Sequence, residues 1–530
     1  MKKLQVWLPL LFALVMIVGM LIGFRLRGNG NLNAGGFFKT RKPTPVQEVI
    51  DLVNMKYVDR IAMDTLDDAA IQGMLAHLDP HSTYIPAVDL SEFNEDLQGN
   101  FEGIGVEFQI FDDTVNIVNV LAGGPSDRAG LQIGDKFLKI NDSAVAGNGI
   151  NGDRIRRLLK GPGGSKVNVR LLRGNQQQTI AVSRGTIPLP SVDVAYMVDK
   201  QTGYLRISKF SETTHAEFAQ AMQQLEKEGL QKLILDLRGN GGGILQEAIE
   251  CADDFLDGDK LIIYTVGAKS PKVEYRCRRD GLFEKGKLVL LTDEGTASAS
   301  EVLTGALQDW DRATIIGRRT FGKGLVMEQY QLSDGSALRL TVARYYTPTG
   351  RSIQKPYNKG HDDYNDEVIR RFHDGEVIHG DTSTAHGQAF TTLGPLKRTV
   401  YGGGGITPDI FVGFDTSTLA KSVTALYIQG TLSRFIYTYY IQHMDGFKSY
   451  KNPESFANGW HDDETLWNNL TTFAKRDTID LSTISAADKR ILQQRIKALL
   501  AKQIWRTQGY YEILNASDPA VTKALEVLNK

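Results

Sequence analysis

The first apolar run of the chain extends from Leu4 to Phe24 and contains no charged residue. Lys2 and Lys3 precede it, and Arg25 and Arg27 follow it. A run of about 20 apolar residues is long enough to span a bilayer. A secretory core is shorter and ends at a small-residue cleavage site, which is not evident here. The pattern predicts an uncleaved signal anchor with the bulk of the chain outside; a cleaved signal peptide and a buried core helix are the alternatives.

The next two segments differ in periodicity. Residues 28–45 are rich in Gly, Asn and Pro, which predicts a tether. Residues 45–77 repeat apolar residues at helical spacing, and Pro80 interrupts that pattern. We therefore expect a linker followed by helices.

In the rest of the chain, the pattern of hydrophobic residues is first alternating, then mixed and finally helical. Residues 104–186 hold short alternating segments separated by turns, which predicts a small β-rich domain. From Tyr204 strands alternate with helices, which favours an α/β sheet with parallel pairs. A hairpin with its turn at Ser333–Ser336 follows, and after about Asp415 the pattern is mostly helical, most clearly over Leu492–Trp505. The strand candidates are Tyr204–Ile207, Lys232–Leu237, Leu261–Thr265, Lys287–Leu291 and Ala313–Ile316.

Composition excludes several classes of protein. The 530 residues include 61 Lys and Arg against 62 Asp and Glu, so the net charge of −1 gives no electrostatic case for nucleic-acid binding. The content of hydrophobic residues, 42%, excludes disorder as the main state. The two cysteines, Cys251 and Cys277, exclude a disulfide scaffold and a cysteine-based zinc module.

A serine-rich segment, Asp293–Glu301, follows an apolar strand and opens a helix. A serine there is placed for nucleophilic attack, because the unpaired N–H groups of a helix start suit a developing oxyanion. The alternative is a capping box formed by Ser298 and Glu301.

A single lysine lies between glycines in the loop Thr320–Gly324. A neutral lysine can act as general base for a serine, which requires burial to lower its pKa from ~10.4 to roughly 7–8. The alternatives are a solvated loop lysine and a phosphate contact, although the segment lacks the P-loop pattern.

Two glycine-rich turns can offer backbone N–H groups to an anion. The strand at Leu233 runs into Gly239–Gly243, which can bind an oxyanion; Ile244 stands where a dinucleotide fingerprint needs glycine. The segment Asn100–Phe108 can hold a terminal carboxylate and accept an extended peptide as an added strand. An ordinary turn is the alternative for each.

The histidines His77 and His81 are four residues apart, but Pro80 lies between them and no acidic residue takes the metalloprotease position. The spacing therefore argues against zinc, and we expect no metal or cofactor.

Together these segments resemble the carboxy-terminal processing (tail-specific) serine peptidases, of the bacterial exported type with one PDZ domain. The resemblance covers about Val46 to Phe411. The matching motifs are His77–Tyr84 (HLDPHSTY), Phe101–Val106 (FEGIGV), Gly123–Leu131 (GGPSDRAGL), Asp236–Asn240 (DLRGN), Thr296–Glu301 (TASASE) and Phe321–Gly324 (FGKG).

The resemblance implies a Ser–Lys dyad, with Ser298 as nucleophile and Lys323 as general base. It implies an oxyanion hole formed by the N–H of Ala299 and one from the glycine turn, for which we take Gly242. The family's PDZ domain binds the substrate's C-terminal tail and gates access. The implied tail-binding residues are Phe101, Gly103, Ile104, Gly105 and Val106.

One position departs from the family pattern. The family usually carries Gln four residues after the catalytic Lys, but this chain has Met327 there, followed by Glu328 and Gln329. Gln329 lies two residues beyond the expected place, about 6–7 Å along an extended strand, so it can orient Lys323 only if the backbone is rearranged.

The resemblance implies a mixed α+β and α/β chain with a ClpP/crotonase-like core. We expect the divisions 1–24 (signal anchor or signal peptide), 25–45 (linker), 46–95 (N-terminal helical part of the protease), 96–186 (PDZ domain), 187–414 (serine protease core) and 415–530 (helical extension, with no role assigned).

The function we expect is an exported serine endopeptidase, anchored in the inner membrane by its N-terminal helix and facing the periplasm or exterior. Its substrates would be proteins or peptides with apolar C-terminal tails, with no nucleic-acid partner; self-association stays open. Met327 motivates an alternative, a catalytically degenerate PDZ scaffold. A His-Asp-Ser protease is a third reading, but no suitable serine motif or histidine context is present.

Overall fold

The computed structural model describes residues 7, 12–20, 44–147, 149, 151–380, 387–414, 420–461 and 464–530. Much of the predicted anchor, Leu4–Phe24, lies outside these residues. In the part of the chain that is described, none of the helices combines the length and apolar character needed to cross a bilayer. The anchor therefore stays a prediction.

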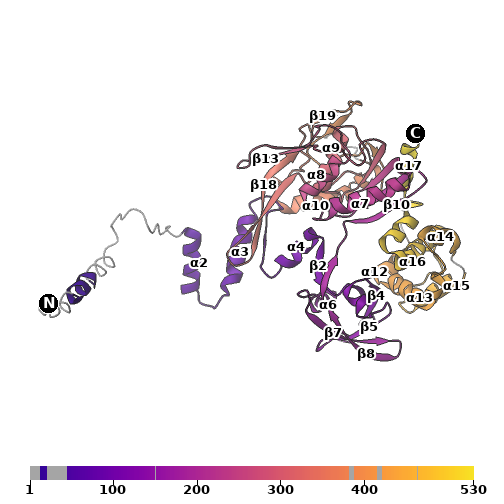
Figure 1. The fold of residues 1–530 in the computed structure, drawn as a ribbon, viewed down its shortest axis with the longest axis horizontal. Coiled ribbons are helices and arrows are strands. Elements are labelled where there is room, and N and C mark those ends of the chain that lie inside the picture. The colour runs from indigo at the N-terminus through magenta and orange to yellow at the C-terminus, as the bar shows by residue number, and fades with distance from the viewer. Residues whose placement is uncertain are drawn as a thin grey trace. The chain divides into compact units, whose positions relative to one another are not determined.

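The chain divides into two compact units, residues 1–73 and 74–530. The first unit holds α2 (Pro45–Lys56) and most of α3 (Met63–Leu75), which confirms the helices expected there (Figure 1). Pro45 opens α2, where its missing N–H costs no hydrogen bond. Neither helix buries a residue.

The β-rich domain begins within the second unit. β2 (Asn100–Gly103) pairs with β9 (Gly185–Pro188), and between them lies a sheet in the order β3-β4-β5-β7-β8, with β6 beside β5. β3 is therefore an edge strand whose backbone groups are free on one side. The elements are β3 (Val106–Phe111), β4 (Thr114–Val120), α5 (Pro125–Arg128), β5 (Lys136–Ile140), β6 (Ser143–Ala144), α6 (Gly152–Leu159), β7 (Lys166–Arg173) and β8 (Gln176–Ser183).

The main sheet of the core has the order β10-β11-β12-β15-β16-β21 and is parallel except for β10. Side chains alternate between its faces: Leu233 and Leu235 pack under α7, α8 and α9, whereas Ile234 packs under α17. The elements are β10 (Val192–Met197), β11 (Thr202–Ile207), α7 (Thr214–Lys227), β12 (Lys232–Asp236), α8 (Leu245–Asp253), β15 (Lys287–Thr292), α9 (Ala299–Asp309), β16 (Thr314–Gly317), β21 (Ile410–Phe411) and α17 (Pro519–Leu528).

A second sheet corrects one expectation. The segment Leu261–Thr265 is a strand, β13 (Leu261–Val266), but it pairs antiparallel with β14 and β18 and does not join the parallel sheet. β14 follows β13 without an intervening helix, so these two strands pair antiparallel, because a parallel pair needs such a crossover. The predicted hairpin at Ser333–Ser336 is confirmed by β17 and β18. The further elements are β1 (Thr83–Ile85), α4 (Leu90–Gln98), β14 (Val273–Arg276), β17 (Leu325–Gln331), β18 (Ala337–Tyr346), α10 (His361–His373), α11 (Glu376–His379), β19 (Ala389–Thr391) and β20 (Thr399–Tyr401).

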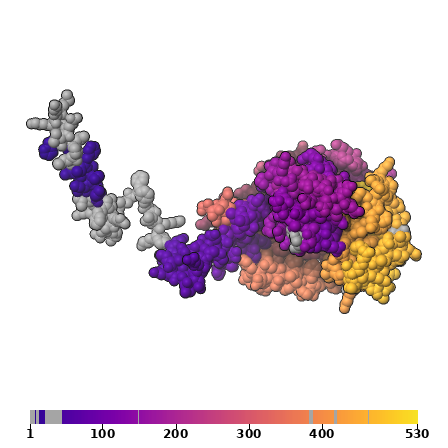
Figure 2. Space-filling model, turned by 90° about the horizontal axis from the view of Figure 1, so that it is seen from below, coloured from indigo at the N-terminus to yellow at the C-terminus, as the bar shows by residue number. Residues whose placement is uncertain are grey.

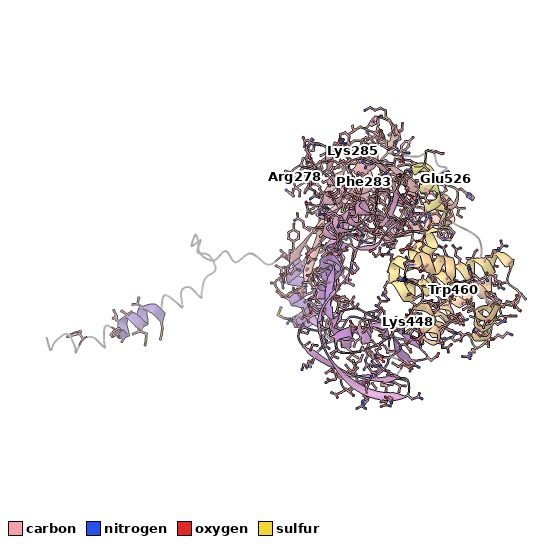
Figure 3. The ribbon with its side chains drawn as sticks, turned by 45° about the vertical axis from the view of Figure 1, so that its right-hand side comes forward. Arg278, Phe283, Lys285, Lys448, Trp460 and Glu526 are labelled. Atoms are coloured by element: carbon pink, nitrogen blue, oxygen red, sulfur yellow. The ribbon has the colours of Figure 1, made fainter. Side chains whose placement is uncertain are left out.

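The C-terminal helices build a hydrophobic core of their own, which we call the helical domain (residues 421–515). Trp460 is stacked on Phe456 inside this domain, and the space-filling view shows the orange and yellow segment as one closely packed body (Figures 2 and 3). The predicted helix Leu492–Trp505 lies in α16. The elements are α12 (Lys421–Ile428), α13 (Thr431–Phe447), α14 (Pro453–Gly459), α15 (Glu464–Lys475) and α16 (Ala486–Asn515). The expected mixed α/β architecture, with a β-rich domain and helical C-terminal region, is confirmed.

Candidate active site

Ser298 stands where the strand β15 turns into the helix α9. Its backbone has φ 56° and ψ −116°, a conformation that residues other than glycine rarely adopt. Such strain persists only where the surroundings impose it. Here the Ser298 N–H donates to Glu301 Oε2 at 2.9 Å, and the Tyr345 hydroxyl lies 2.9 Å from the Ser298 carbonyl oxygen. Both contacts hold the serine at the helix start.

Glu301 joins the Ser298 turn to the loop that carries Lys323. Its side chain is completely buried and accepts hydrogen bonds from the backbone N–H groups of Gly322 and Lys323, each at 2.8 Å, and from the Thr320 hydroxyl. Burial raises the pKa of Glu301, although these hydrogen bonds act in the opposite direction. With the bond from Ser298, one carboxylate fixes both loops.

Lys323 is the group whose charge matters most for general-base chemistry. Burial lowers its pKa, and the positive charge of Arg339 lowers it further, while Glu301 and Asp79 partly oppose the shift. Within the described part of the chain, no hydrogen bond or ion pair is recorded for its ammonium group, including to Ser298 Oγ. The direction of the shift is the one that a neutral lysine base requires.

A cavity of about 730 Å³, which we call the Ser298 cavity, brings the predicted residues together. Ser298, Ala299, Lys323, Gly242 and Gln329 all line it. Its other walls come from the glycine turn, from β17 and β18, and from α4. These further lining residues are Asn94, Leu97, Gln98, Glu212, Gly241, Gly243, Ile244, Leu245, Leu325, Val326, Met327, Arg339 and Tyr345.

The glycine turn passes directly beside the serine. A Cβ atom at Gly242 would lie 2.7 Å from Ser298 Cβ and 2.9 Å from Ala299 N, so only glycine fits there. Among the described groups, the Ala299 N–H has no recorded acceptor, as an oxyanion donor requires. The Gly242 N–H, in contrast, already donates to Asn240 Oδ1 at 2.9 Å. Its predicted part in the oxyanion hole therefore stays a prediction.

The position that departs from the family pattern also lines the cavity. Met327 and Gln329 are two residues apart on β17. The Gln329 amide contacts Asn94 Oδ1 at 3.4 Å and accepts from Arg339 at 3.3 Å, rather than contacting Lys323. The register of β17 and β18 shifts after Val326, but the extra residue lies on β18 and does not bring Gln329 nearer.

Residues 79–82 support the cavity from behind, a role that the sequence did not reveal. Asp79 accepts hydrogen bonds from Ser82 and from the Thr341 hydroxyl, and Thr341 lies opposite Met327. Burial would raise the pKa of Asp79, but these hydrogen bonds outweigh it and lower the pKa. The motif at residues 77–84 was the sequence signal that could have pointed to this supporting role. The roles of Glu301, Arg339 and Tyr345 depend on contacts between segments that are distant in the sequence.

His81 is neutral at physiological pH in this environment. Burial, followed by the charge of Lys323, lowers its pKa to about 4, and its Nε2 lies 2.8 Å from the Tyr364 hydroxyl. In the described residues, no group of His, Cys, Asp and Glu side chains is arranged to hold a metal ion.

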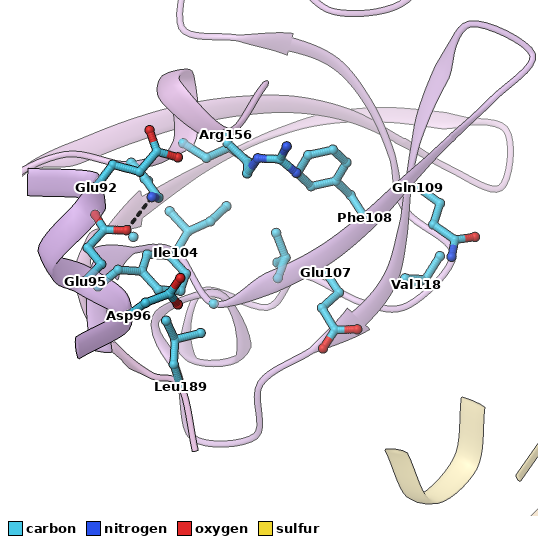
Figure 4. A pocket seen from close by; sticks show the side chains of 16 residues that line it. Glu92, Glu95, Asp96, Ile104, Glu107, Phe108, Gln109, Val118, Arg156 and Leu189 are labelled. Atoms are coloured by element: carbon cyan, nitrogen blue, oxygen red, sulfur yellow. Dashed lines mark hydrogen bonds and ion pairs between the residues drawn. The ribbon is translucent and has the colours of Figure 1, made fainter. Parts of the chain in front are cut away.

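A second cavity of about 450 Å³ lies between β3 and α6, and we call it the β3–α6 groove (Figure 4). Phe101, Gly103, Ile104, Gly105 and Val106, the predicted tail-binding residues, all line it. Ser126 and Leu121 donate to the carbonyl groups of Ile104 and Gly105, which fixes the loop, and Gly105 has φ +73°.

The rim of this groove is charged. Lys160 forms an ion pair with Glu95 of α4, marked by the dashed line in Figure 4, and lies 5.2 Å from the Phe101 ring centroid. The helix α4 contributes residues to both cavities: Glu92, Glu95 and Asp96 line the groove, and three of its other residues line the Ser298 cavity.

Comparison with known proteins agrees with this geometry. The model of "Peptidase family S41" matches residues 201–362, and the model of "PDZ domain" matches residues 117–173. The chain belongs to peptidase family S41. A family of unknown function matches residues 423–506, within the helical domain.

The relatives of this S41 chain include two curated staphylococcal proteins. A probable CtpA-like serine protease of Staphylococcus epidermidis is 34% identical over 311 residues, which cover 58% of this chain and 62% of the relative. The corresponding protein of Staphylococcus aureus strain N315 gives the same values. The chain thus spans less than two thirds of the length of these relatives.

Two solved structures are also similar. A photosystem II D1 C-terminal processing protease is 30% identical, with 58% of this chain and 89% of that chain covered and a TM-score of 0.34. The PDZ domain of a carboxy-terminal protease from Vibrio cholerae, in complex with peptide, is 31% identical; it covers 17% of this chain and 99% of that chain, with a TM-score of 0.16.

Proposed function

We propose that this S41 chain is a serine endopeptidase that recognises C-terminal tails and cleaves with a dyad of Ser298 and Lys323. The observation that carries the proposal is that both residues line one cavity while the pKa of Lys323 is lowered by burial. Membership of the S41 family and the match to a PDZ domain support it.

The proposed mechanism proceeds through an acyl-enzyme. Neutral Lys323 takes the proton of Ser298 Oγ as that oxygen attacks the scissile carbonyl carbon. The Ala299 N–H, with an N–H of the glycine turn, stabilises the oxyanion. Lys323 then gives the proton to the leaving amine, and water hydrolyses the acyl-enzyme. No step needs a metal or nucleotide.

The tail-recognition site is the β3–α6 groove. The exposed edge of β3 can take up an extended peptide as an added strand, and the loop Phe101–Val106 can hold its terminal carboxylate. The apolar lining supports a preference for apolar tails; it includes Ile104, Phe108, Val118, Leu159 and Leu189.

We further propose that the run Leu4–Phe24 tethers the chain to the inner membrane, with the protease in the periplasm or outside the cell. The support is the length of the uncharged run and its basic flanks. Fractionation of cells with alkaline carbonate extraction tests it: the proposal requires the intact chain to stay with the membranes.

A catalytically degenerate PDZ scaffold is the second candidate. It is favoured by Met327 and by the contacts that tie Gln329 to Asn94 and Arg339. In this case the chain would bind tails and leave cleavage to a partner.

Both candidates are separated by one experiment on the full chain. The wild type, Ser298→Ala and Lys323→Ala are incubated with an unfolded protein that ends in an apolar tail, and tail affinity is measured in parallel. The protease proposal predicts cleavage by the wild type only, with a loss on the order of 10³-fold or more in both variants and unchanged tail affinity. A wild type that binds the tail without cleaving it supports the scaffold; a gain of activity in Met327→Gln would then identify a degenerate site.

A further inference from the structure

The helical domain is fixed to the protease core at both of its ends. Before it, β21 pairs with β16 in the main sheet. After it, α17 buries Ala520, Val521 and Ala524 against that sheet, and Asp518 at its start binds Arg238. A domain held at two points and with its own hydrophobic core can act as a rigid support.

One face of the helical domain, on α13, contacts the PDZ domain. The Tyr437 ring lies 5.5 Å from the Phe111 ring, and the Tyr437 side chain is almost completely buried. Arg434 forms an ion pair with Asp112 at 2.9 Å. The strand end and turn of β3 therefore contact two consecutive turns of α13.

Apolar packing extends the same contact. Ile133 of the PDZ domain packs against the core of the helical domain. Gly134 lies beside α13: a Cβ atom there would be in ordinary van der Waals contact with Ile441 Cδ1, at 3.5 Å. Because Ile441 is four residues after Tyr437, both side chains lie on one helix face. The PDZ domain thus meets one face of α13, formed by Arg434, Tyr437 and Ile441, which we call the α13 seat. With Phe111, Asp112 and Gly134 these residues also line a cavity of about 470 Å³ between the two domains.

A further contact of the helical domain reaches β3, the strand that lines the β3–α6 groove. Arg506 pairs with Glu107 of β3 and stands at the kink of α16, where its φ of 62° departs from helical geometry. Glu107 lines the β3–α6 groove, whereas no described residue of the helical domain does. The helical domain therefore holds β3 without filling the groove.

We propose that the α13 seat docks the chain's own PDZ domain, and that the helical domain thereby fixes the direction in which the groove presents a bound tail to the Ser298 cavity. The partner surface is the aromatic and acidic turn of Phe111 and Asp112 with Ile133. The second half of the proposal rests on the proposed function; the docking does not.

Hydrogen exchange of the full chain, read by mass spectrometry, tests the docking. In Tyr437→Ala we expect the amides of residues 111–114 to exchange about tenfold faster, because the turn loses its support. The affinity for a labelled peptide with an apolar C-terminus should stay within about twofold, since Tyr437 does not line the groove. Tyr427→Ala, an exposed aromatic of α12, is the matched control and should leave residues 111–114 unchanged.

The reverse variant keeps the test decisive if Tyr437→Ala unfolds the helical domain. Phe111→Ala should speed exchange in α13, and the double variant should exchange no faster than the faster single variant, because both truncations remove one contact. Unchanged exchange at residues 111–114 in Tyr437→Ala, or fully additive effects in the double variant, would overturn the docking.

Cleavage tests the orienting role. We expect Tyr437→Ala to cleave a tail-bearing protein about tenfold more slowly and a short tail-less peptide at the wild-type rate. Lys448→Ala is the control for surface changes, because Lys448, labelled in Figure 3, is exposed and forms an exposed ion pair with Asp445. Equal losses on both substrates, or none, overturn the orienting role. A wild type that cleaves neither substrate counts against the proposed function, while the exchange results still decide the docking.

Discussion

The Ser298 cavity and the β3–α6 groove differ in which part of the chain is proposed to face the substrate. In the proposed mechanism, the reacting groups of the cavity are the side chains of Ser298 and Lys323, whose backbone groups are held by the buried carboxylate of Glu301 and by the Tyr345 hydroxyl. In the groove, the proposal is that the backbone of Phe101–Val106 and the free edge of β3 face the peptide. A cavity that depends on side chains should be sensitive to isosteric substitutions, whereas a groove built from backbone should be sensitive mainly to changes of backbone conformation.

The largest effect that sharpens this contrast is expected from Glu301→Gln. The amide would place a donor against N–H groups that now donate, so the two loops should move apart. We expect a loss of about 1–3 kcal/mol in the free energy of unfolding and a fall in cleavage on the order of 10²-fold. Tail affinity should be unchanged. Chemical denaturation and peptide cleavage measure these effects; cleavage at the wild-type rate would show that Glu301 does not position the dyad.

The groove should instead respond to Gly105→Ala. Gly105 has φ +73°, and a Cβ atom would lie 3.1 Å from Ile187 Cδ1. An alanine in this region costs about 1–2 kcal/mol, so tail affinity should fall about tenfold, whereas cleavage of a tail-less peptide should persist. Gly123→Ala introduces the same strain at φ +68° with open space around it and outside the groove. If both variants lose affinity equally, the loop conformation is not what binds the tail.

A smaller effect is expected on the pH dependence of cleavage in the Ser298 cavity. Cleavage should rise with pH as Lys323 loses its proton, with a midpoint below that of an ordinary lysine because its pKa is lowered by burial and by Arg339. Arg339→Gln removes a positive charge, so the pKa of Lys323 should rise and the profile should shift to higher pH by on the order of half a unit. The profile of kcat/KM measures this shift. Arg344→Gln is the control, and a shift to lower pH in Arg339→Gln would contradict the assignment.

The smallest effect is expected at the rim of the groove. The side chains of Lys160 and Glu95 are 25% and 18% exposed, and such pairs contribute less than about 1 kcal/mol. Lys160→Ala should lower tail affinity no more than about fivefold and should weaken its salt dependence. Lys166→Ala, exposed on β7, is the control. A loss as large as that in Gly105→Ala, measured by peptide titration, would show that charge carries tail binding.

Local patterns pointed to Ser298 and Lys323, and the family resemblance added Gly242, Ala299 and Gln329; all five line the cavity. Ser298, Lys323 and Gly242 each follow a strand of the core, and loops at the ends of neighbouring strands meet in space. Glu301 was visible only as a capping residue. Its link to Lys323 could not be read from the sequence, because a hydrogen bond between residues 22 positions apart leaves no periodic signal.

Strand pairing and contacts between domains were harder to predict from the sequence. The apolar run at Leu261–Thr265 predicted a strand, but alternation within one strand does not specify its partner, and β13 joined the second sheet. The helices after Asp415 were predicted without a role. The packing of α17 on the main sheet and the contact of Tyr437 with Phe111 depend on three-dimensional complementarity between distant segments.

The dyad can be tested by trapping the acyl-enzyme. The full chain would be treated with an activated ester of an apolar peptide, quenched in acid and digested for mass spectrometry. The account predicts an acyl group on the peptide that contains Ser298, formed on the order of 10³-fold more slowly in Lys323→Ala. Acylation of another residue, or an unchanged rate in Lys323→Ala, would contradict it.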